Sequence, residues 1–266
     1  MSIDNITVLI KGAGEMASGV AVRLKNSHFK VCMTEADSPQ AVRREVSFCE
    51  AVYDGEKTVE GITARLVHEF HEIPGVLEKG EIPVIVDPEA KVSEFLKPHV
   101  IVDAILAKKN LGTKIIDAPL VIGLGPGFCA GMDVHIVVET MRGHNLARVM
   151  WEGEAEPNTG TPGTIDGFAA ERVFRAPMKG RLKTIKKIGD FVKAEDVVAM
   201  VEGSPIEAEI DGIVRGLLRD GIEVWEGMKT GDIDPRGKLE YCYTVSEKAR
   251  AIGGAVLEGI LSHYNG

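Results

Sequence analysis

Closely spaced glycines near the N-terminus offer a site for a negatively charged ligand. Residues 12–17 fit G-x-G-x-x-A, with Gly12, Gly14 and Ala17 in the three defining places. An apolar run rich in β-branched residues precedes the motif at 6–10, and a helical pattern follows at 20–25. A second apolar run, 30–34, ends on Glu35. This order of strand, glycine turn, helix, strand and acid predicts a site for the diphosphate of a dinucleotide.

Each position of that turn has a physical reason. Gly12 permits the tight turn, Gly14 has no side chain to keep a diphosphate off the backbone, and Ala17 lets the helix pack close to the sheet. The helix N-terminus presents free N–H groups and the positive end of the helix dipole to an anion. Glu35 is placed to accept a hydrogen bond from a ribose hydroxyl. The alternative is a turn that only closes a strand–helix junction.

A further candidate acid ends a later apolar run. The run 99–102 leads directly into Asp103, and ligands of an open parallel sheet lie beyond the carboxyl ends of its strands. Asp103 is therefore a candidate ligand-binding residue, with a plain strand-end turn acid as the alternative. The predicted cofactor-binding residues are Gly12, Ala13, Gly14, Glu15, Met16, Ala17, Glu35 and Asp103.

A second glycine-rich stretch, 123–133, carries the candidates for catalysis. Cys129 is bracketed by glycines, and an accessible thiol could carry sulfur or selenium as a nucleophile, although free cysteines are usually small buried hydrophobes. Asp133 and His135 are two residues apart on a predicted strand, so they share a face and could pair as acid and base. We therefore predict Cys129, Asp133 and His135 as catalytic residues, with a solvated turn as the alternative.

Composition narrows the classes of function. The 266 residues carry a net charge of −9, so there is no basic surplus to neutralise the phosphates of a nucleic acid. No apolar run approaches the length of a membrane span, and the start lacks the features of a signal peptide, which favours the cytoplasm. No pair among the four cysteines forms C-x-x-C, and His68 and His71 are spaced one residue short of H-E-x-x-H, so no metal site is expected.

The second half contains an internal repeat with an offset of 32 residues. The repeated residues are Ala176, Gly180, Gly189 and Val192, which recur as Ala208, Gly212, Gly221 and Val224. Two such halves predict a small barrel sandwich, and the stretch 176–180 resembles the biotinyl/lipoyl-type motif. Carrier domains of that type attach their cofactor to a lysine in the hairpin between the halves. Here no lysine occurs between Lys193 and Lys229, so covalent biotin or lipoate is excluded at that position.

The order of these patterns predicts the fold class and the domains. Apolar runs that alternate with helices in the first half indicate a parallel sheet. The predicted fold class is α/β, a Rossmann-like parallel sheet with a C-terminal all-β barrel-sandwich hybrid module of the biotinyl/lipoyl type. The predicted domains are 1–150 (Rossmann-like, nucleotide-binding), 151–168 (linker), 169–245 (barrel-sandwich hybrid) and 246–266 (C-terminal helix).

Several stretches resemble YqeB-type accessory proteins of the selenium-dependent molybdenum hydroxylase system. They are 11–19, 60–62, 123–128 with 133–135, 157–160 and 234–237, spread over nearly the whole chain. The Gly-Pro-Gly-Phe and Asp-Pro-Arg stretches are the most specific. The first domain is more distantly similar to xanthine dehydrogenase accessory factors, which are implied to handle molybdenum cofactor and its terminal sulfur ligand. The resemblance implies a role in the selenium-dependent molybdenum hydroxylase system, but it assigns no catalytic residues to this chain.

Three functions compete at this point. The leading one is a maturation factor for a selenium-dependent molybdenum hydroxylase, which would be its client, with a dinucleotide or molybdopterin-type cofactor at the glycine turn. The runner-up is an NAD(P)-dependent oxidoreductase, supported by the turn and Glu35 but lacking a convincing hydride-transfer set. The third is a non-enzymatic scaffold whose barrel docks on a client. A homo-oligomer is plausible, and whether the protein is an enzyme stays open.

Overall fold

The computed structural model describes residues 3–160 and 163–265, which form two compact units. Unit 1 comprises Met1–Pro39, Ser47–Asn158 and Val245–Gly266, and unit 2 comprises Gln40–Val46 and Thr159–Thr244. This division differs from the predicted domains in three respects. The last helix belongs to unit 1, a short segment from the first half of the chain belongs to unit 2, and the predicted linker 151–168 is divided between the units after Asn158. Each unit is therefore built from pieces that are distant in sequence.

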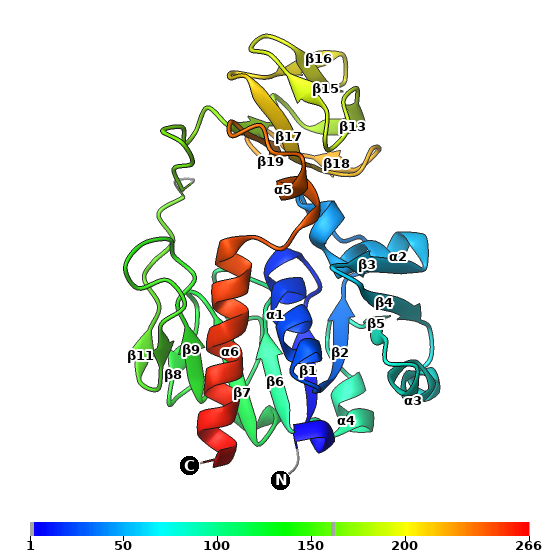
Figure 1. Ribbon diagram of the computed structural model, residues 1–266, viewed down its shortest axis with the longest axis vertical. Helices are drawn as coiled ribbons and strands as arrows, with labels where there is room; N and C mark the ends of the chain where they lie inside the picture. Colours follow the sequence, from blue (N-terminus) through cyan, green and yellow to red (C-terminus); the bar gives the residue numbers. More distant parts are fainter. Residues whose placement is uncertain (1–2, 161–162, 266) are drawn as a thin grey trace. The chain divides into compact units, whose positions relative to one another are not determined.

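Unit 1 is built on a large sheet, in which nine strands are assigned within the described residues (Figure 1). Their order across the sheet is β10 (Val149–Met150), β9 (Ile136–Val138), β7 (Leu120–Leu124), β6 (Val100–Asp103), β1 (Thr7–Lys11), β2 (Lys30–Glu35), β5 (Ile82–Val86), β4 (Ile62–Val67) and β3 (Glu56–Val59). The strands from β9 to β4 are parallel, whereas β10 and β3 run antiparallel to their neighbours at the two edges. The central strands are buried on both faces, as their near-continuous apolar sequences require.

Helices pack on both faces of this sheet. Helices α1 (Glu15–Asn26) and α6 (Glu247–Asn265) lie side by side, and α6 also contacts β7, β9 and β10 (Figure 1). The short helices α3 (Ile73–Glu78) and α4 (Val92–Leu96) contribute to an apolar cluster with Leu9, Ile101 and Val121 of the central strands. Helix α2 (Ala51–Asp54) precedes the β3–β4 hairpin, and β8 (Cys129–Ala130) pairs with β11 (Gly153–Glu154). Among the described residues, no helix is long and apolar enough to cross a membrane.

Unit 2 contains two antiparallel sheets, each with four strands assigned in the part of the chain that the structure describes. One has the order β12 (Val173–Arg175), β19 (Lys229–Asp234), β17 (Gly212–Leu217) and β14 (Phe191–Val192). The other has the order β16 (Ser204–Glu207), β15 (Val197–Val201), β13 (Gly180–Thr184) and β18 (Glu223–Val224). A short helix, α5 (Glu240–Tyr243), contacts β17. The apolar interior includes Leu182, Val198, Val214 and Ile233.

The 32-residue repeat is confirmed by the strand pairing of unit 2. Gly180 of β13 lies opposite Val224 of β18, and Gly212 of β17 lies opposite Val192 of β14. Each residue of the second pair is the repeat partner of one in the first pair. The two copies therefore pair reciprocally, each supplying strands to both sheets.

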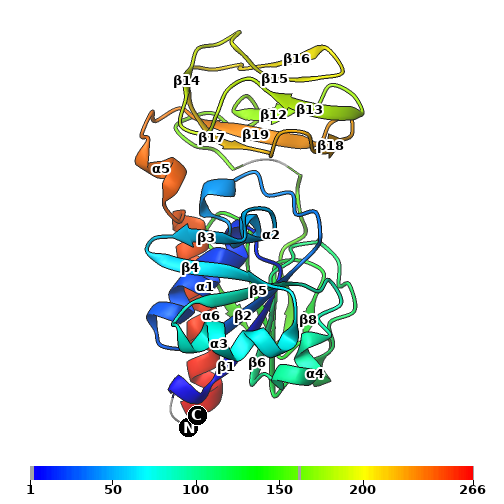
Figure 2. The ribbon, with the colours of Figure 1, turned by 90° about the vertical axis from the view of Figure 1, so that its right-hand side faces the viewer.

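The predicted fold class, a Rossmann-like parallel sheet with a biotinyl/lipoyl-like barrel-sandwich hybrid, is wrong. The large sheet is mixed, because β10 and the β3–β4 hairpin add antiparallel pairs at its two edges. Figure 2 shows the β3–β4 hairpin beside β5. The repeats of unit 2 form two separate antiparallel sheets. Apolar runs mark strands, but they do not state which edge a strand joins or in which direction it runs. Those choices come from pairings between distant segments.

Candidate functional site

The glycine turn lies where β1 ends and α1 begins. Gly12 has φ +89°, which favours glycine, and its N–H donates to the carbonyl of Thr34 at 2.9 Å. A Cβ atom on Gly12 would lie 3.2 Å from the carbonyl oxygen of Ala104. The predicted reason for Gly12, a tight turn, is therefore confirmed. The backbone of the segment after β6 also leaves little room for a side chain, which is a second reason for glycine at position 12.

Gly14 differs from Gly12 because the protein itself does not require a glycine there. It precedes α1 with φ −69° and ψ −173°, an extended conformation that other residues adopt. A Cβ atom on Gly14 would meet nothing within 4 Å. The space that a side chain would fill is open, so the backbone of Gly14 is accessible to a ligand.

The amides that follow Gly14 are also available. In the residues that the structure describes, the backbone N–H groups of Gly14, Met16 and Ala17 have no hydrogen-bond partner, whereas that of Ser18 bonds the carbonyl of Gly14 at 2.8 Å. No side chain caps the helix. Open donors at a helix N-terminus, together with the positive end of its dipole, suit an anion.

Glu35 lies against the turn, as the sequence predicts. One carboxylate oxygen accepts from the N–H of Ala13 and the other from the N–H of Ala36, both at 2.8 Å. Burial raises the pKa of Glu35, and these two hydrogen bonds oppose the shift. The carboxylate thus fixes the backbone on the β1 side of the open amides. Each of its oxygens keeps a lone pair for a ligand hydroxyl.

Asp103 is engaged by a polar cluster made of Lys11, Asp103 and Thr113, here called the Lys11 cluster. These residues are 8%, 2% and 1% exposed. The Thr113 hydroxyl donates to Asp103 Oδ2 at 2.6 Å, and the Ile105 N–H donates to Oδ1 at 3.3 Å. Lys11 Nζ donates to Thr113 Oγ1 and lies 3.5 Å from Asp103 Oδ2. The predicted ligand-binding acid is thus already held by protein groups.

Sequence reasoning missed Lys11 and Thr113. A signal was present for Lys11, because it ends an apolar run that forms a central strand, where a charged group needs a partner. Thr113 is 102 residues away in sequence and carried no comparable signal.

Three glycines of the stretch 123–133 lie against other parts of the protein, whereas a Cβ atom on Gly131 would meet nothing within 4 Å. A Cβ atom on Gly123 would lie 2.5 Å from the ring of Phe128, and one on Gly127 would lie 2.6 Å from the backbone of Lys109. Gly125 is similarly close to the Thr140 side chain. Close approach of backbone is what these glycines allow, and at these three positions the approaching group is the chain itself.

The structure does not assemble the three predicted catalytic residues. Asp133 accepts from the backbone N–H of Cys129 at 2.9 Å, and Nδ1 of His135 accepts from the N–H of Val121 at 3.0 Å. The Cys129 thiol is half-buried, with its sulfur 3.9 Å from the carbonyl oxygen of Ala130. Within the described residues no hydrogen bond or ion pair joins these three side chains. His135 precedes β9, near the amino end of β7, whereas the glycine turn follows the carboxyl end of β1.

The chain is similar to the uncharacterized protein YqeB of Escherichia coli (strain K12). The two sequences are 52% identical over 254 residues, which cover 96% of this chain and 47% of the E. coli protein. The chain therefore spans about half the length of the curated relative it matches. No family model matches the chain. This likeness supports a YqeB-type protein, as the sequence stretches indicated.

Solved structures similar to the chain include an aspartoacylase family protein and a succinylglutamate desuccinylase/aspartoacylase. An aspartoacylase family protein of Mesorhizobium loti is 9% identical, with a TM-score of 0.28 over 86% of this chain and 84% of that one. A succinylglutamate desuccinylase/aspartoacylase of Rhodobacter sphaeroides is 15% identical, with a TM-score of 0.27 over 86% and 84% of the two chains. TM-scores this low establish neither a shared fold nor a shared activity.

Proposed function

We propose that this protein is a maturation factor for a selenium-dependent molybdenum hydroxylase and binds a diphosphate-bearing cofactor of the molybdopterin dinucleotide type at the glycine turn. The process is taken from the sequence resemblance to YqeB-type accessory proteins. The ligand class is taken from the turn. The observation that carries the proposal is Gly14. Its conformation and surroundings would accept a small side chain, but glycine leaves its backbone exposed next to the N–H groups that are available to a ligand.

The physical case for a diphosphate is local. The chain as a whole is negatively charged, so a bound anion must be held by fixed donors and not by a general positive field. The amides of Gly14, Met16 and Ala17 supply such donors, and the dipole of α1 adds about 0.3–1 kcal/mol for a charge near its N-terminus. Glu35, next to this group, would accept from a ribose hydroxyl of the same ligand.

The experiment is a calorimetric titration of the purified protein with molybdopterin dinucleotide and, separately, with NAD⁺. Gly14→Ala should leave the melting temperature nearly unchanged and weaken binding at least about tenfold, because the new methyl group would stand where the diphosphate approaches. Gly254→Ala is the matched control, since its Cβ also meets nothing within 4 Å and lies in α6. If neither ligand binds the unaltered protein, the proposal fails.

A second candidate is an NAD-dependent oxidoreductase. The observation that favours it is the position of Glu35, since a carboxylate beside the ribose favours NAD over NADP by repelling a 2′-phosphate. Against it, Cys129, Asp133 and His135 form no catalytic group. Turnover of NADH by the purified protein, together with unchanged hydroxylase activity in cells that lack it, would favour this candidate over the maturation factor.

A further inference from the structure

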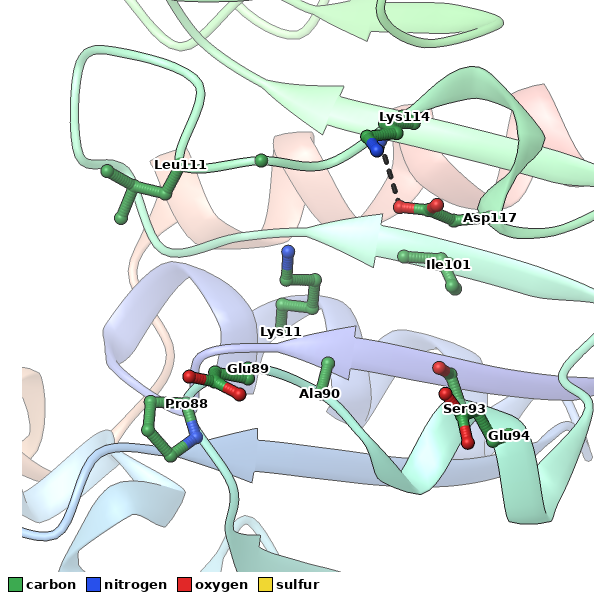
Figure 3. A pocket seen from close by; sticks show the side chains of 11 residues that line it. Lys11, Pro88, Glu89, Ala90, Ser93, Glu94, Ile101, Leu111, Lys114 and Asp117 are labelled. Carbon is green, nitrogen blue, oxygen red and sulfur yellow. Dashed lines mark hydrogen bonds between the residues drawn. The ribbon is translucent and has the colours of Figure 1, made fainter.

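Unit 1 contains a pocket of about 460 Å³ on the side of β1 that Lys11 faces (Figure 3). Its walls come from β1, the segment that leads into α4, and the segment 111–117. The Lys11 side chain rises from β1 toward the segment that carries Leu111. We infer that this pocket binds a small molecule through an anionic group, a carboxylate or a phosphate, held by the Lys11 ammonium.

The hydrogen bonds of the Lys11 cluster have a fixed direction. The Thr113 hydroxyl donates its proton to Asp103, so its oxygen presents lone pairs to Lys11. Lys11 is therefore the donor to Thr113, as the ammonium group requires. Asp103 receives donors on both oxygens and lies beside the Lys11 side chain. Together these bonds orient Lys11.

This orientation leaves donor capacity on Lys11 unused. An ammonium group has three N–H bonds. The one hydrogen bond that the Lys11 side chain makes within the described residues goes to Thr113, while the 3.5 Å to Asp103 is ion-pair distance and longer than an N–H···O bond. A lysine that only neutralised Asp103 would not need to line a cavity. Here it lines one, and its remaining donors are available to a ligand.

Two ammonium groups and three carboxylates line the pocket, so the anionic group of a ligand is expected at the cations and away from the acids. Glu89 forms an ion pair with Lys91, and Asp117 accepts from the backbone N–H of Lys114. Glu94 is exposed in the first turn of α4. Lys114 is the second cation of the lining. A second anion site beside the glycine turn goes beyond the proposed function, because a ligand here need not touch the open amides of α1.

The test uses the full chain labelled with ¹⁵N and two probes, sodium acetate and inorganic phosphate, each titrated at constant ionic strength. Amide chemical shifts of residues 111–114 should move with at least one probe and saturate. The double variant Lys11→Met with Asp103→Asn should bind that probe about tenfold more weakly or worse, because a charge-assisted hydrogen bond is lost. The double change avoids leaving a buried carboxylate without its cation. Lys97→Met, at an exposed lysine outside the lining, is the control for loss of a lysine elsewhere on the surface.

The outcomes separate the sources of the anion and the two proposals. Saturation by acetate alone assigns a carboxylate, and saturation by phosphate alone or by both assigns a phosphate-capable site. Lys11→Arg, which keeps the charge, should retain part of the binding and show that the fold tolerates change at this position. Gly14→Ala should leave these shifts unchanged even if diphosphate binding is lost. Absence of saturation with both probes, or equal binding by the double variant, overturns the inference.

Discussion

At the scale of single residues, His135 is better explained as a backbone acceptor than as a catalytic base. Its Nδ1 atom accepts from the N–H of Val121, so that nitrogen must be unprotonated. Burial lowers the pKa of His135, and the neighbouring His263, whose ring centre is 6.2 Å away, lowers it further. The folded state therefore prefers the neutral imidazole.

This preference predicts a pH dependence of stability. Because the folded pKa lies below the unfolded value of about 6.5, the unfolded state binds more protons between the two values. The contribution of His135 is therefore fully present above about pH 6.5 and is lost as the pH falls through the folded pKa. Urea unfolding at pH 7.5 and pH 5.0 should show a smaller difference for His135→Asn, which keeps an acceptor oxygen but does not titrate.

The control for this prediction is His28→Asn, a change at an exposed histidine with φ +69°, a conformation that asparagine tolerates. It should leave the pH difference as it is in the unaltered protein. An unchanged pH difference in His135→Asn would show that other groups carry the acid sensitivity.

At the scale of elements, the packing of α1 against α6 depends on glycine. A Cβ atom on Gly19 would lie 2.6 Å from the Cβ of Ala249, and one on Gly253 would lie 2.8 Å from the carbonyl oxygen of Gly19. The backbones of the two helices are therefore as close as the absence of side chains permits. In α6, an added Cβ atom would also be crowded at Gly259, 3.0 Å from the Ile136 side chain, whereas one on Gly254 would meet nothing within 4 Å.

Two adjacent substitutions should consequently have opposite effects. Gly253→Ala should lower the free energy of unfolding by about 1–3 kcal/mol, because the added methyl group forces the helices apart. Gly254→Ala should raise it by about 0.5–1 kcal/mol, because alanine costs less backbone entropy than glycine in a helix. Urea denaturation measures both. Equal effects of the two substitutions would contradict the close contact of α1 with α6.

At the scale of the whole molecule, unit 2 contains a short segment whose neighbours in sequence belong to unit 1. The segment Gln40–Val46 is part of unit 2, although its flanks belong to unit 1. The carbonyl of Val42 accepts from the N–H of Leu217, and Arg44 Nε donates to the carbonyl of Leu217, both at 2.8 Å. The buried Arg43 donates to the carbonyl of Tyr241 at 2.8 Å. Unit 2 is complete only when this segment is in place.

Arg43→Met should therefore destabilise unit 2, although residue 43 lies between two segments of unit 1. Loss of the hydrogen bond that the buried, charged Arg43 side chain donates to the carbonyl of Tyr241 costs about 1–3 kcal/mol. Hydrogen exchange followed by mass spectrometry should show faster exchange in peptides from 173–234, with peptides from 7–35 changed much less. Arg181→Met, at an exposed position of β13, is the control and should change neither set. Faster exchange confined to 7–35 would contradict the division into units.

Features that depend on neighbours in sequence were predictable. The turn at Gly12, the position of Glu35 against it and the 32-residue repeat all arise from short segments whose backbone conformation restricts the residue type. Features that depend on distant contacts were not. The mixed sheet arises from edge pairings, the Lys11 cluster joins residues 102 apart, and the stretch 123–133 folds so that Asp133 and His135 bond different backbone groups.

The sequence by itself determined where the chain must turn and which strands are buried, because glycine conformation and apolar patterning act within a few residues. Only the tertiary structure decided the direction of the edge strands, the partners of Asp103 and the freedom of Gly14. Each of these depends on which distant segment occupies the space beside a residue. Which segment lies there is decided when the core packs, because side chains from every part of the chain then compete for the same volume.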